Sequence, residues 1–462
     1  MKKLNSNKTL NMKQAFFLFI VFPLSTLNVF VQAQNLPFQP YPTISCSQTQ
    51  SCPQEWPCCS QYWTCGSGPV CVTGCNPKMS FSNDSCLPQA AFLPPNVMRK
   101  KPFVKLKAGS YKMQEVESDD DTIDQKEDSK KRWVYKFFNN NEELVKMNAG
   151  ANFEFAQNSL KDYFKVGNTN IMSWTRYLIA DDSESAIAQW DNVDFTYSGT
   201  LKIFNADDSE IYLTMPKKTA GSLLTTTHTI LYGRIAVKLK TARSRGVVTS
   251  IVLFSSVHDE IDFEFLGGDL LNAQTNYYHQ GELIHTRMKL ARVSSDTYEN
   301  YHIYEIDWNE NRIIWLIDGT PFRTLTKEET WDSVKNIYKY PQTPMKLHIA
   351  VWPGGDAQNH PGTVAWAGGL IDWENAPDIT EKGEFNCKVK EILIEPFETE
   401  QLAQLQQTFL KSPTPKDSRV YWRFDVQNGK SHSLSNVNFV LEAGPVPYLQ
   451  NSKSKGAASH AL

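Results

Sequence analysis

Apolar and polar residues alternate over many short segments between residues 153 and 397. In residues 230–239 every second position is apolar or glycine, and residues 247–254 form a run rich in β-branched side chains. A period of two predicts β-strands, because neighbouring side chains of a strand point to opposite faces. Further strands are predicted at residues 304–308, 312–317, 322–325, 345–351 and 389–394.

Tight turns join several of these segments. Asn309, Glu310 and Asn311 connect two predicted strands, and Asp318 with Gly319 forms the next hairpin turn. Long helical patterns are absent here, and only residues 400–410 resemble a short helix. We therefore predict an all-β fold, a two-sheet β-sandwich or jelly roll, preceded by a small disulfide-rich module.

Composition changes several times along the chain and divides it into five parts. We expect a signal peptide at 1–33, a cysteine-rich module at 34–90, a flexible linker at 91–150, the β-sandwich domain at 151–400 and a polar tail at 401–462. The tail contains one strand-like stretch at 420–424, and we assign it no chemistry.

The first 33 residues have the layout of a secretory signal. Four lysines precede an apolar run, and Val31 and Ala33 place small residues before a cleavage site. A membrane anchor is less well supported, because Pro23 and Asn28 interrupt the run. The C-terminus lacks the hydrophobic tail of a lipid-anchor signal. We expect a secreted protein without a membrane anchor.

Net charge argues against nucleic-acid binding. The 462 residues carry a formal charge of −3, and 41% of them are hydrophobic, which also excludes wholesale disorder. Residues 115–128 hold eight acids and one lysine, a composition typical of a solvated insert. Lys131 and Arg132 follow shortly and could form a dibasic processing site.

Cysteine usage supports an oxidising compartment. Eight of the nine cysteines lie between Cys46 and Cys86, a density typical of disulfide-linked modules. Asn83 begins a glycosylation sequon, which we expect on a surface loop. Cys387 stands in an alternating segment, and we expect a buried, inert thiol there.

Residues 258–265, with the sequence HDEIDFEF, contain the main candidate for chemistry. Glu260, Asp262 and Glu264 point to one face of the predicted strand, and the residues between them are apolar. Three neighbouring carboxylates repel one another, so function explains them better than a solvated strand face does. Divalent metal binding is an alternative, but no histidine cluster or glycine loop supplies further ligands. We expect no metal and no cofactor.

Glycoside cleavage uses two such carboxylates. Cα atoms of Glu260 and Glu264 would lie roughly 13 Å apart on a straight strand. Inward-leaning side chains would reduce the gap to about 5 Å, the separation typical of a retaining pair. Glu260 would then stay ionised and Glu264 protonated, with Asp262 between them keeping their titrations apart.

The acidic segment resembles the catalytic signature of glycoside hydrolase family 16, and more narrowly the fungal Crh transglycosylases, which join chitin to β-glucan. The similarity covers about residues 173–397, with matching motifs at 230–234, 259–269, 275–278, 301–308, 315–319, 344–352 and 366–369. The resemblance implies a jelly roll with Glu260 as nucleophile, Asp262 as its helper and Glu264 as acid/base.

The same resemblance implies sugar contacts from Trp352, Thr363 and Trp366. From the residues alone, both tryptophans could belong to the core, but the glycines that follow Trp352 indicate a loop leaving a strand. Pro353 stands where the family usually has alanine.

Residues 46–75 resemble the hevein-like chitin-binding module. That resemblance implies the pairs Cys46–Cys59, Cys52–Cys65 and Cys58–Cys71, which leaves Cys75–Cys86. It also implies sugar contacts from Ser60 and Tyr62. Thr64 and Val70 replace aromatic residues of the family, and Trp63 could compensate in part. A purely structural disulfide knot therefore stays open as an alternative.

We expect a secreted, monomeric, retaining enzyme that cleaves chitin and transfers the chain to β-glucan. A β-glucan hydrolase of the same superfamily and a wall lectin without catalysis are the alternatives. The module without a lipid anchor resembles the Crh-related proteins of yeast spore walls, which implies the fungal cell wall, and the spore wall in particular, as its location.

Overall fold

The computed structural model describes most of the chain after the expected signal. The described residues are 40, 42–67, 74–82, 85–86, 88–92, 137–138, 144–145, 171–173, 195–204, 210–402, 404–405, 419–424 and 437–444. The expected signal peptide, the acidic block, the dibasic pair, Cys71 and Asn83 lie outside these residues. Among the described helices, none combines the length and the apolar character needed to cross a membrane.

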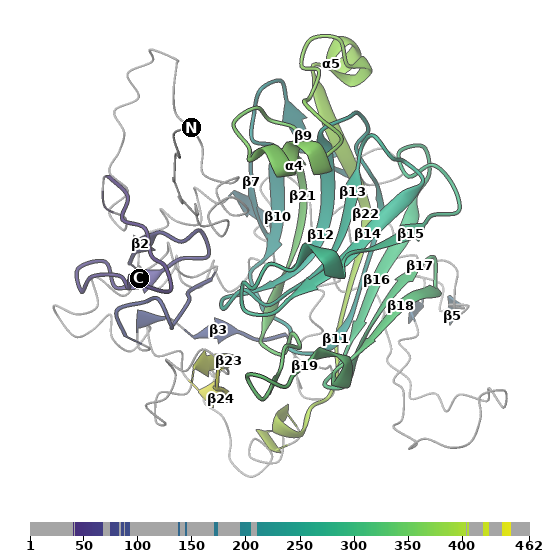
Figure 1. Ribbon diagram of the computed structural model, residues 1–462. Coiled ribbons are helices and arrows are strands. Elements are labelled where there is room, and N and C mark those ends of the chain that lie inside the picture. The colour runs from purple at the N-terminus through teal and green to yellow at the C-terminus, as the bar shows by residue number, and fades with distance from the viewer. Residues whose placement is uncertain are drawn as a thin grey trace, which may run out of the picture.

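Two large β-sheets form the central domain (Figure 1). One has the strand order β15-β14-β13-β12-β21-β10-β7-β6, and the other has the order β18-β17-β16-β11-β22-β9-β8. The strands of the first sheet are β6 (Ile171–Ser173), β7 (Phe195–Ser198), β10 (Ser222–Thr226), β12 (Val247–Ser255), β13 (Glu260–Leu266), β14 (Asn272–Tyr278), β15 (Lys289–Arg292) and β21 (Met345–Pro353). Those of the second are β8 (Thr200–Phe204), β9 (Glu210–Pro216), β11 (Gly233–Lys240), β16 (His302–Trp308), β17 (Arg312–Ile317), β18 (Thr320–Thr326) and β22 (Glu384–Pro396).

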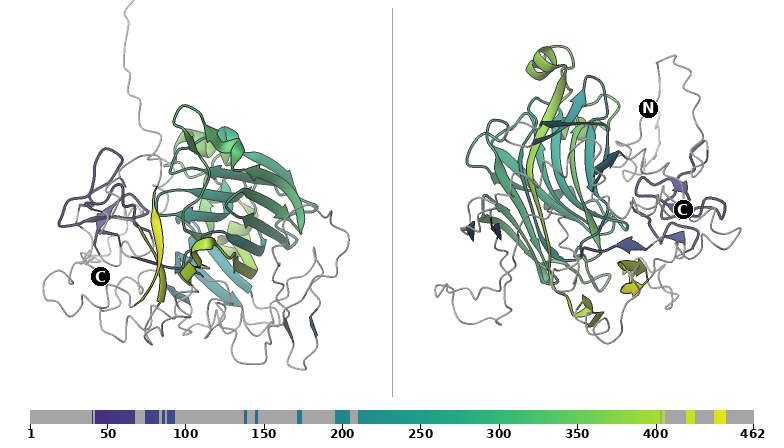
Figure 2. Two further views of the ribbon diagram at one scale, coloured as in Figure 1. Left: turned by 90° about the horizontal axis from the view of Figure 1, so that it is seen from below. Right: turned by 180° about the vertical axis from the view of Figure 1, so that it is seen from behind.

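Short elements connect these strands. They are the 3₁₀ turns η5 (His285–Arg287) and η6 (Glu328–Thr330), the strand pair β19 (Trp331–Asp332) and β20 (Ile337–Tyr338), and the helices α4 (Pro361–Trp366) and α5 (Pro377–Lys382). Pairing is antiparallel throughout both large sheets except between β6 and β7. The predicted all-β jelly-roll architecture is confirmed, and Figure 2 shows the two sheets packed face to face.

Alternation along the strands explains the shared core. In β17, Ile313, Trp315 and Ile317 are buried, whereas the residues between them are partly exposed. The predicted turn at Asp318 and Gly319 has φ angles of 50° and 75°, the left-handed backbone that a two-residue hairpin needs. Cys387 is a buried free thiol, as expected, and burial raises its pKa to about 12.

The cysteine-rich module is small and held by disulfides. Its strands β1 (Cys58–Cys59) and β2 (Cys65–Gly66) form a two-stranded sheet. Three of the four expected cysteine pairs are disulfides in the structure: Cys46–Cys59, Cys52–Cys65 and Cys75–Cys86. The fourth expected pair includes Cys71, which is not among the described residues.

A three-stranded sheet links the module to the jelly roll. Strand β3 (Gln89–Ala90) pairs with β23 (Arg419–Phe424), which pairs with β24 (Phe439–Gly444). Part of the expected polar tail is therefore a β-hairpin whose Trp422 is buried against the core. The sequence indicated only the first of these two strands. Strands β4 (Phe137–Phe138) and β5 (Leu144–Val145) form a pair inside the expected linker.

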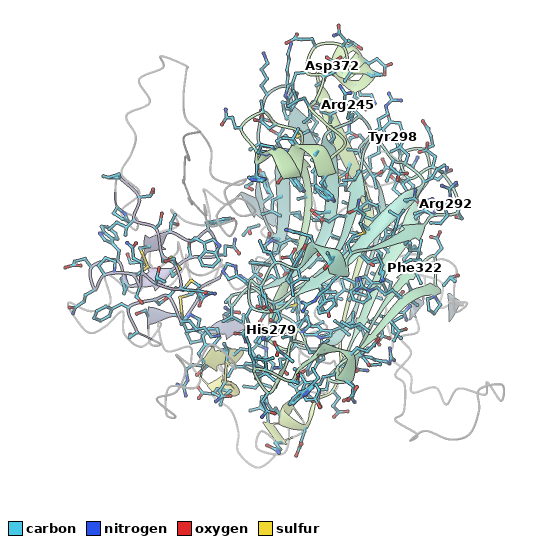
Figure 3. The ribbon with its side chains drawn as sticks, in the orientation of Figure 1. Arg245, His279, Arg292, Tyr298, Phe322 and Asp372 are labelled. Atoms are coloured by element: carbon cyan, nitrogen blue, oxygen red, sulfur yellow. A yellow bond between two sulfur atoms is a disulfide. The ribbon has the colours of Figure 1, made fainter. Side chains whose placement is uncertain are left out.

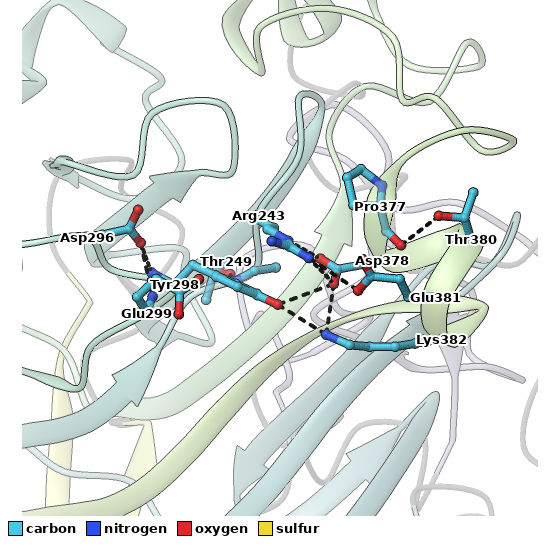
Figure 4. Close-up of polar contacts among 11 residues, drawn as sticks. Arg243, Thr249, Asp296, Tyr298, Glu299, Pro377, Asp378, Thr380, Glu381 and Lys382 are labelled. Carbon is cyan, nitrogen blue, oxygen red and sulfur yellow. Dashed lines mark hydrogen bonds and ion pairs between the residues drawn. The ribbon is translucent and has the colours of Figure 1, made fainter.

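The buried carboxylate of Asp378 fixes α5 to the segment that follows β11 (Figure 4). Arg243 donates two hydrogen bonds, of 2.9 and 3.1 Å, to the buried carboxylate of Asp378. Lys382 and the hydroxyl of Tyr298 also donate to Asp378, at 2.9 and 3.3 Å. Burial opposes the charge of Asp378, but these partners outweigh it and lower its pKa. The cluster anchors the segment that follows α4.

Candidate active site

The acidic residues lie on strand β13, between β12 and β14. Ile261, Phe263 and Phe265 are buried in the core between the sheets. The rings of Phe263 and Phe265 pack against Tyr304, with centroids 5.6 and 4.5 Å away. Because side chains alternate along a strand, the three carboxylates lie on the opposite face of the sheet.

Side chains on that face line an open cleft, whose space amounts to about 1050 Å³ when the solvent at its opening is included. Glu260 and Glu264 line the cleft, and Asp262 is buried between them with 1% of its surface exposed. Side chains from β12, β21 and β10 extend the floor of the cleft. Residues 198–199, residues 220–221 and two residues of the cysteine-rich module complete its lining. The other lining residues are Gln61, Tyr62, Ser198, Gly199, Ala220, Gly221, Ser222, Leu223, Ser250, Val252, Phe254, His348, Ala350, Val351 and Trp352.

Burial raises the pKa of all three carboxyls. Desolvation is the main cause, and repulsion from Asp262 adds to it for both Glu260 and Glu264, whose pKa values lie well above the ordinary range. Burial raises the pKa of Asp262 to about 7, although the N–H of Asn276 and the guanidinium of Arg323 act in the opposite direction. The raised pKa suits Glu264 as an acid. Glu260, which we expected to be ionised, also has a raised pKa, because it is buried and lies near the carboxyls of Asp262 and Glu264.

Neighbouring strands hold the acidic strand β13 in place. The indole N–H of Trp315, on the other sheet, donates a hydrogen bond of 3.0 Å to the carbonyl oxygen of Asp262. On β14, Asn276 lies opposite Asp262 and Tyr278 lies opposite Glu260. The Asn276 amide donates to the Tyr278 hydroxyl at 2.8 Å, and this hydroxyl also contacts His285 at 3.2 Å. These contacts fix the side chains next to the carboxylates.

Asp259, the fourth acid of the segment, has a structural role. It is fully buried, and its carboxylate accepts hydrogen bonds from the backbone of Gln280 and Gln342 and from Thr343, at 2.9, 3.1 and 2.7 Å. Burial opposes its charge, but these donors and His279 outweigh burial and lower its pKa. Asp259 therefore ties together the loops at the Glu260 end of β13.

Two tryptophans lie beside the carboxylates. Trp352, at the end of β21, lines the cleft, and Trp366 of α4 stacks on it with ring centroids 5.9 Å apart. The Trp366 indole donates a hydrogen bond of 2.8 Å to Gln274, which is paired with Glu264 across the sheet. Thr363 is buried in α4 and does not line the cleft. Sugar contact by these residues stays a prediction.

Glycines bring the two tryptophan-bearing loops together. The N–H of Gly355 donates to the carbonyl oxygen of Gly246 at 2.8 Å. A Cβ on Gly355 would lie 2.2 Å from the carbonyl oxygen of Gly369 and 2.7 Å from the Cα of Gly246. Only glycine permits this backbone contact, which explains the paired glycines that follow Trp352 and Trp366.

Sequence reasoning identified Trp352 of β21 but missed the contribution of the rest of β21 and of β12 to the cleft. Lys346, His348, Ala350 and Trp352 alternate along β21 and share its cleft-facing side with Phe254 of β12. Burial lowers the pKa of Lys346 to about 7. Burial, with a smaller effect from Lys346, lowers the pKa of His348 to about 3. The alternation was visible in the sequence, but it could not indicate which face carries the cleft.

The two predicted sugar-binding residues of the cysteine-rich module differ in position. Ser60 is fully buried, and its hydroxyl shares a 2.8 Å hydrogen bond with Thr64. Tyr62 is half-buried and lines the cleft of the jelly roll.

Three module cysteines, Cys46, Cys52 and Cys65, place their sulfurs within 4.8 Å of one another, but as disulfides they offer no thiolate to a metal.

A jelly roll with a carboxylate pair on one cleft-lining strand is an arrangement suited to glycoside cleavage. The family model "Glycosyl hydrolases family 16" matches residues 189–368. The chain belongs to the fungal Crh family within this group.

Similarity to proteins of known sequence supports the assignment to this family. A protein of Saccharomyces cerevisiae described as "Probable glycosidase CRR1" is 43% identical over 402 residues, which cover 86% of this chain and 88% of the yeast protein. "Crh-like protein 2" of Aspergillus fumigatus is 37% identical over 79% of this chain and 65% of its own length. Among solved structures, "Apo Crh5 transglycosylase" is 33% identical, covers 44% of this chain and 79% of that chain, and has a TM-score of 0.39.

Proposed function

We propose that the protein is a retaining transglycosylase that cleaves chitin and transfers the new end to β-glucan in the fungal cell wall. The observation that carries this proposal is the placement of Glu260 and Glu264 in one cleft, four residues apart on β13, with Asp262 buried between them. Two carboxyls on one side of a bound chain suit double displacement at an anomeric carbon.

In the first step, Glu260 attacks the anomeric carbon of a β-1,4 linkage while Glu264 gives its proton to the departing oxygen. A covalent glycosyl-enzyme forms, and the sugar with the new hydroxyl leaves. The raised pKa of Glu264 keeps that proton in place until it is needed. Repulsion among the three groups favours a shared proton, and a proton on Asp262 would donate a hydrogen bond to the Glu260 carboxylate.

In the second step, Glu264 accepts a proton from an incoming hydroxyl, which attacks the glycosyl-enzyme and releases Glu260. A glucan hydroxyl gives a cross-link, and water gives hydrolysis. Trp352, on which Trp366 stacks, supplies an apolar surface in the cleft that holds the carboxylates, which favours a bound sugar over water at this point.

The proposal is tested with chitin as donor and a fluorescent β-glucan oligosaccharide as acceptor. We expect the label to become linked to chitin, and we expect Glu260→Gln to abolish this transfer. Release of reducing ends from β-glucan but none from chitin would favour the β-glucan hydrolase. Binding of both polymers without turnover of either would favour the lectin.

We also propose that the spore wall is the site of action, on the basis of the sequence resemblance alone. Antibody detection of the protein in separated vegetative and spore walls tests this. A protein confined to vegetative walls would contradict it.

A further inference from the structure

The cysteine-rich module is attached to the jelly roll by strand pairing. The segment after its last disulfide is β3, whose Ala90 pairs with Tyr421 of β23. The N–H of Phe92 donates to the carbonyl oxygen of Thr229 at 2.8 Å, and the N–H of Thr229 donates to that of Ala90 at 2.8 Å. The side chain of Gln89 also donates to Ser256. A module held this closely is not a tethered domain that moves freely.

The module also contacts the jelly roll directly, next to the catalytic strand. The ring of Trp63 lies 4.3 Å from that of His258, two residues before Glu260. Lys78 donates a hydrogen bond to the side chain of Gln280, in the loop after β14. Figure 3 labels the neighbouring His279 where the jelly roll faces the module. These two contacts hold the segment around Trp63 next to the cleft.

Tyr62 and Gln61 consequently line the same cleft as Glu260 and Glu264. Tyr62 is half-buried, and burial raises the pKa of its phenol to about 12, with the Gln61 side chain acting in the opposite direction. An aromatic ring with a hydroxyl, beside a carboxamide, offers the apolar face and the polar groups that a pyranose ring requires. Trp352 presents a second aromatic ring to this cleft.

We propose that Tyr62 and Gln61 form a sugar subsite of the catalytic cleft, so that the cysteine-rich module is part of the active site. The occupant is one sugar unit of the β-linked chain that reacts at Glu260 and Glu264. The inference rests on the proposed function for the identity of that chain, and it adds a specificity-determining residue from outside the jelly roll.

The test uses the full chain with Glu260→Gln, which binds sugar without turnover, and adds Tyr62→Ala or Tyr62→Phe. Calorimetry measures the affinity for chitin and β-1,3-glucan oligosaccharides of two to six units. We expect Tyr62→Ala to weaken binding of the longer oligosaccharides about tenfold and to leave the shortest ones unchanged. Tyr62→Phe should retain most of the affinity. Phe81→Ala is the matched control, because Phe81 is an exposed aromatic residue of the same module outside the cleft.

Hydrogen exchange supplies a second measurement on the same complexes. A bound hexasaccharide should protect both the segment around Tyr62 and β13. Equal affinities for Tyr62→Ala and Phe81→Ala, or protection of β13 alone, would overturn the subsite, and so would the absence of any binding. Higher transglycosylase activity of Tyr62→Ala in the otherwise unaltered enzyme would show that the module blocks the cleft instead.

The two proposals fail in different ways. If Tyr62 and Gln61 form no subsite, the unaltered enzyme should still transfer chitin to β-glucan. Failure of the proposed function would appear as binding and turnover of β-glucan alone, and the Tyr62 effect would still be measured with that polymer.

Discussion

Trp63 of the cysteine-rich module packs against His258, with ring centroids 4.3 Å apart and planes tilted by 50°. His258 in turn packs edge-on against Phe254, at 5.1 Å, and Phe254 packs edge-on against His348, at 5.8 Å. Phe254 is paired with Glu260 across the sheet. A row of four rings therefore connects the module to the floor of the cleft, so the module and strand β13 are structurally coupled.

The roles of the two glutamates can be separated by azide rescue. Removal of either carboxyl, as in Glu260→Gly or Glu264→Gly, should lower turnover of a chromogenic substrate by about 10²- to 10⁴-fold. With azide, the Glu260 variant should give the α-glycosyl azide, because azide replaces the nucleophile. The Glu264 variant should give the β-azide, because azide attacks the covalent intermediate. Product configuration is read by NMR, and reversed configurations would exchange the two roles. Glu299→Gln, at an exposed acid, is the control.

The buried carboxyls should make stability fall as the pH rises. Burial raises the pKa of Asp262 from 3.8 to about 7, so between these values the folded protein keeps a proton that the unfolded chain releases. This contribution is complete below about pH 4 and is lost as the pH approaches 7. Asp262→Asn should therefore gain stability relative to the unaltered protein across this window, by on the order of 2–4 kcal/mol. Denaturation curves from pH 4 to 8 measure the difference, and parallel curves for the two proteins would contradict it.

Trp352 should contribute to substrate affinity more than to the chemical step. Its ring lines the cleft and stacks on Trp366, whose own position is fixed by Gln274. Trp352→Ala should raise KM about tenfold with a smaller change in kcat, because it removes contact with a bound sugar. Trp331→Ala removes an exposed tryptophan outside the cleft and should leave both constants unchanged. An unchanged KM in Trp352→Ala would assign this tryptophan to packing alone.

The bidentate contact of Arg243 with Asp378 should stabilise the region around α5. Lysine at position 243 keeps the charge but cannot reproduce two hydrogen bonds from a planar group, so Arg243→Lys should cost about 1–2 kcal/mol. Asp378→Ala should cost more, about 2–3 kcal/mol, because it removes the charged acceptor of the hydrogen bonds from Arg243, Lys382 and Tyr298. Thermal unfolding measures both. Arg245→Lys is the control, because Arg245 is exposed and donates to one carbonyl oxygen, that of Leu370. Equal melting temperatures for the two lysine variants would contradict the prediction.

Local pattern was sufficient to predict strand β13 and the face on which its acids lie. Alternation placed Glu260, Asp262 and Glu264 on one face, and the structure has the apolar residues between them in the core. Likewise, the Asp318 and Gly319 turn followed from residues that accept a left-handed backbone. Each of these features depends on neighbours within a few positions, which a single sequence displays directly.

Contacts between distant segments could not be predicted in this way. The pairing of β3 with β23 joins residues more than 300 positions apart, and the contact of Trp63 with His258 joins residues almost 200 positions apart. Neither leaves a periodic signal, so Tyr62 was predicted as a residue of a separate chitin-binding surface. Its position in the cleft that holds Glu260 and Glu264 depends on how the module packs, which only the three-dimensional structure shows.

Loss of the Trp63 ring should loosen the module without unfolding it. The three described disulfides hold the module itself, whereas Trp63 supplies an aromatic contact to the jelly roll. Trp63→Ala should therefore leave the disulfides intact and raise amide exchange in residues 257–260 by about tenfold or more. Mass spectrometry measures this exchange, with Phe81→Ala as the matched aromatic control. If Tyr62 forms a subsite, the same variant should weaken binding of long oligosaccharides, because the module no longer holds Tyr62 against the cleft. Unchanged exchange and unchanged affinity in Trp63→Ala would show that β3 alone positions the module.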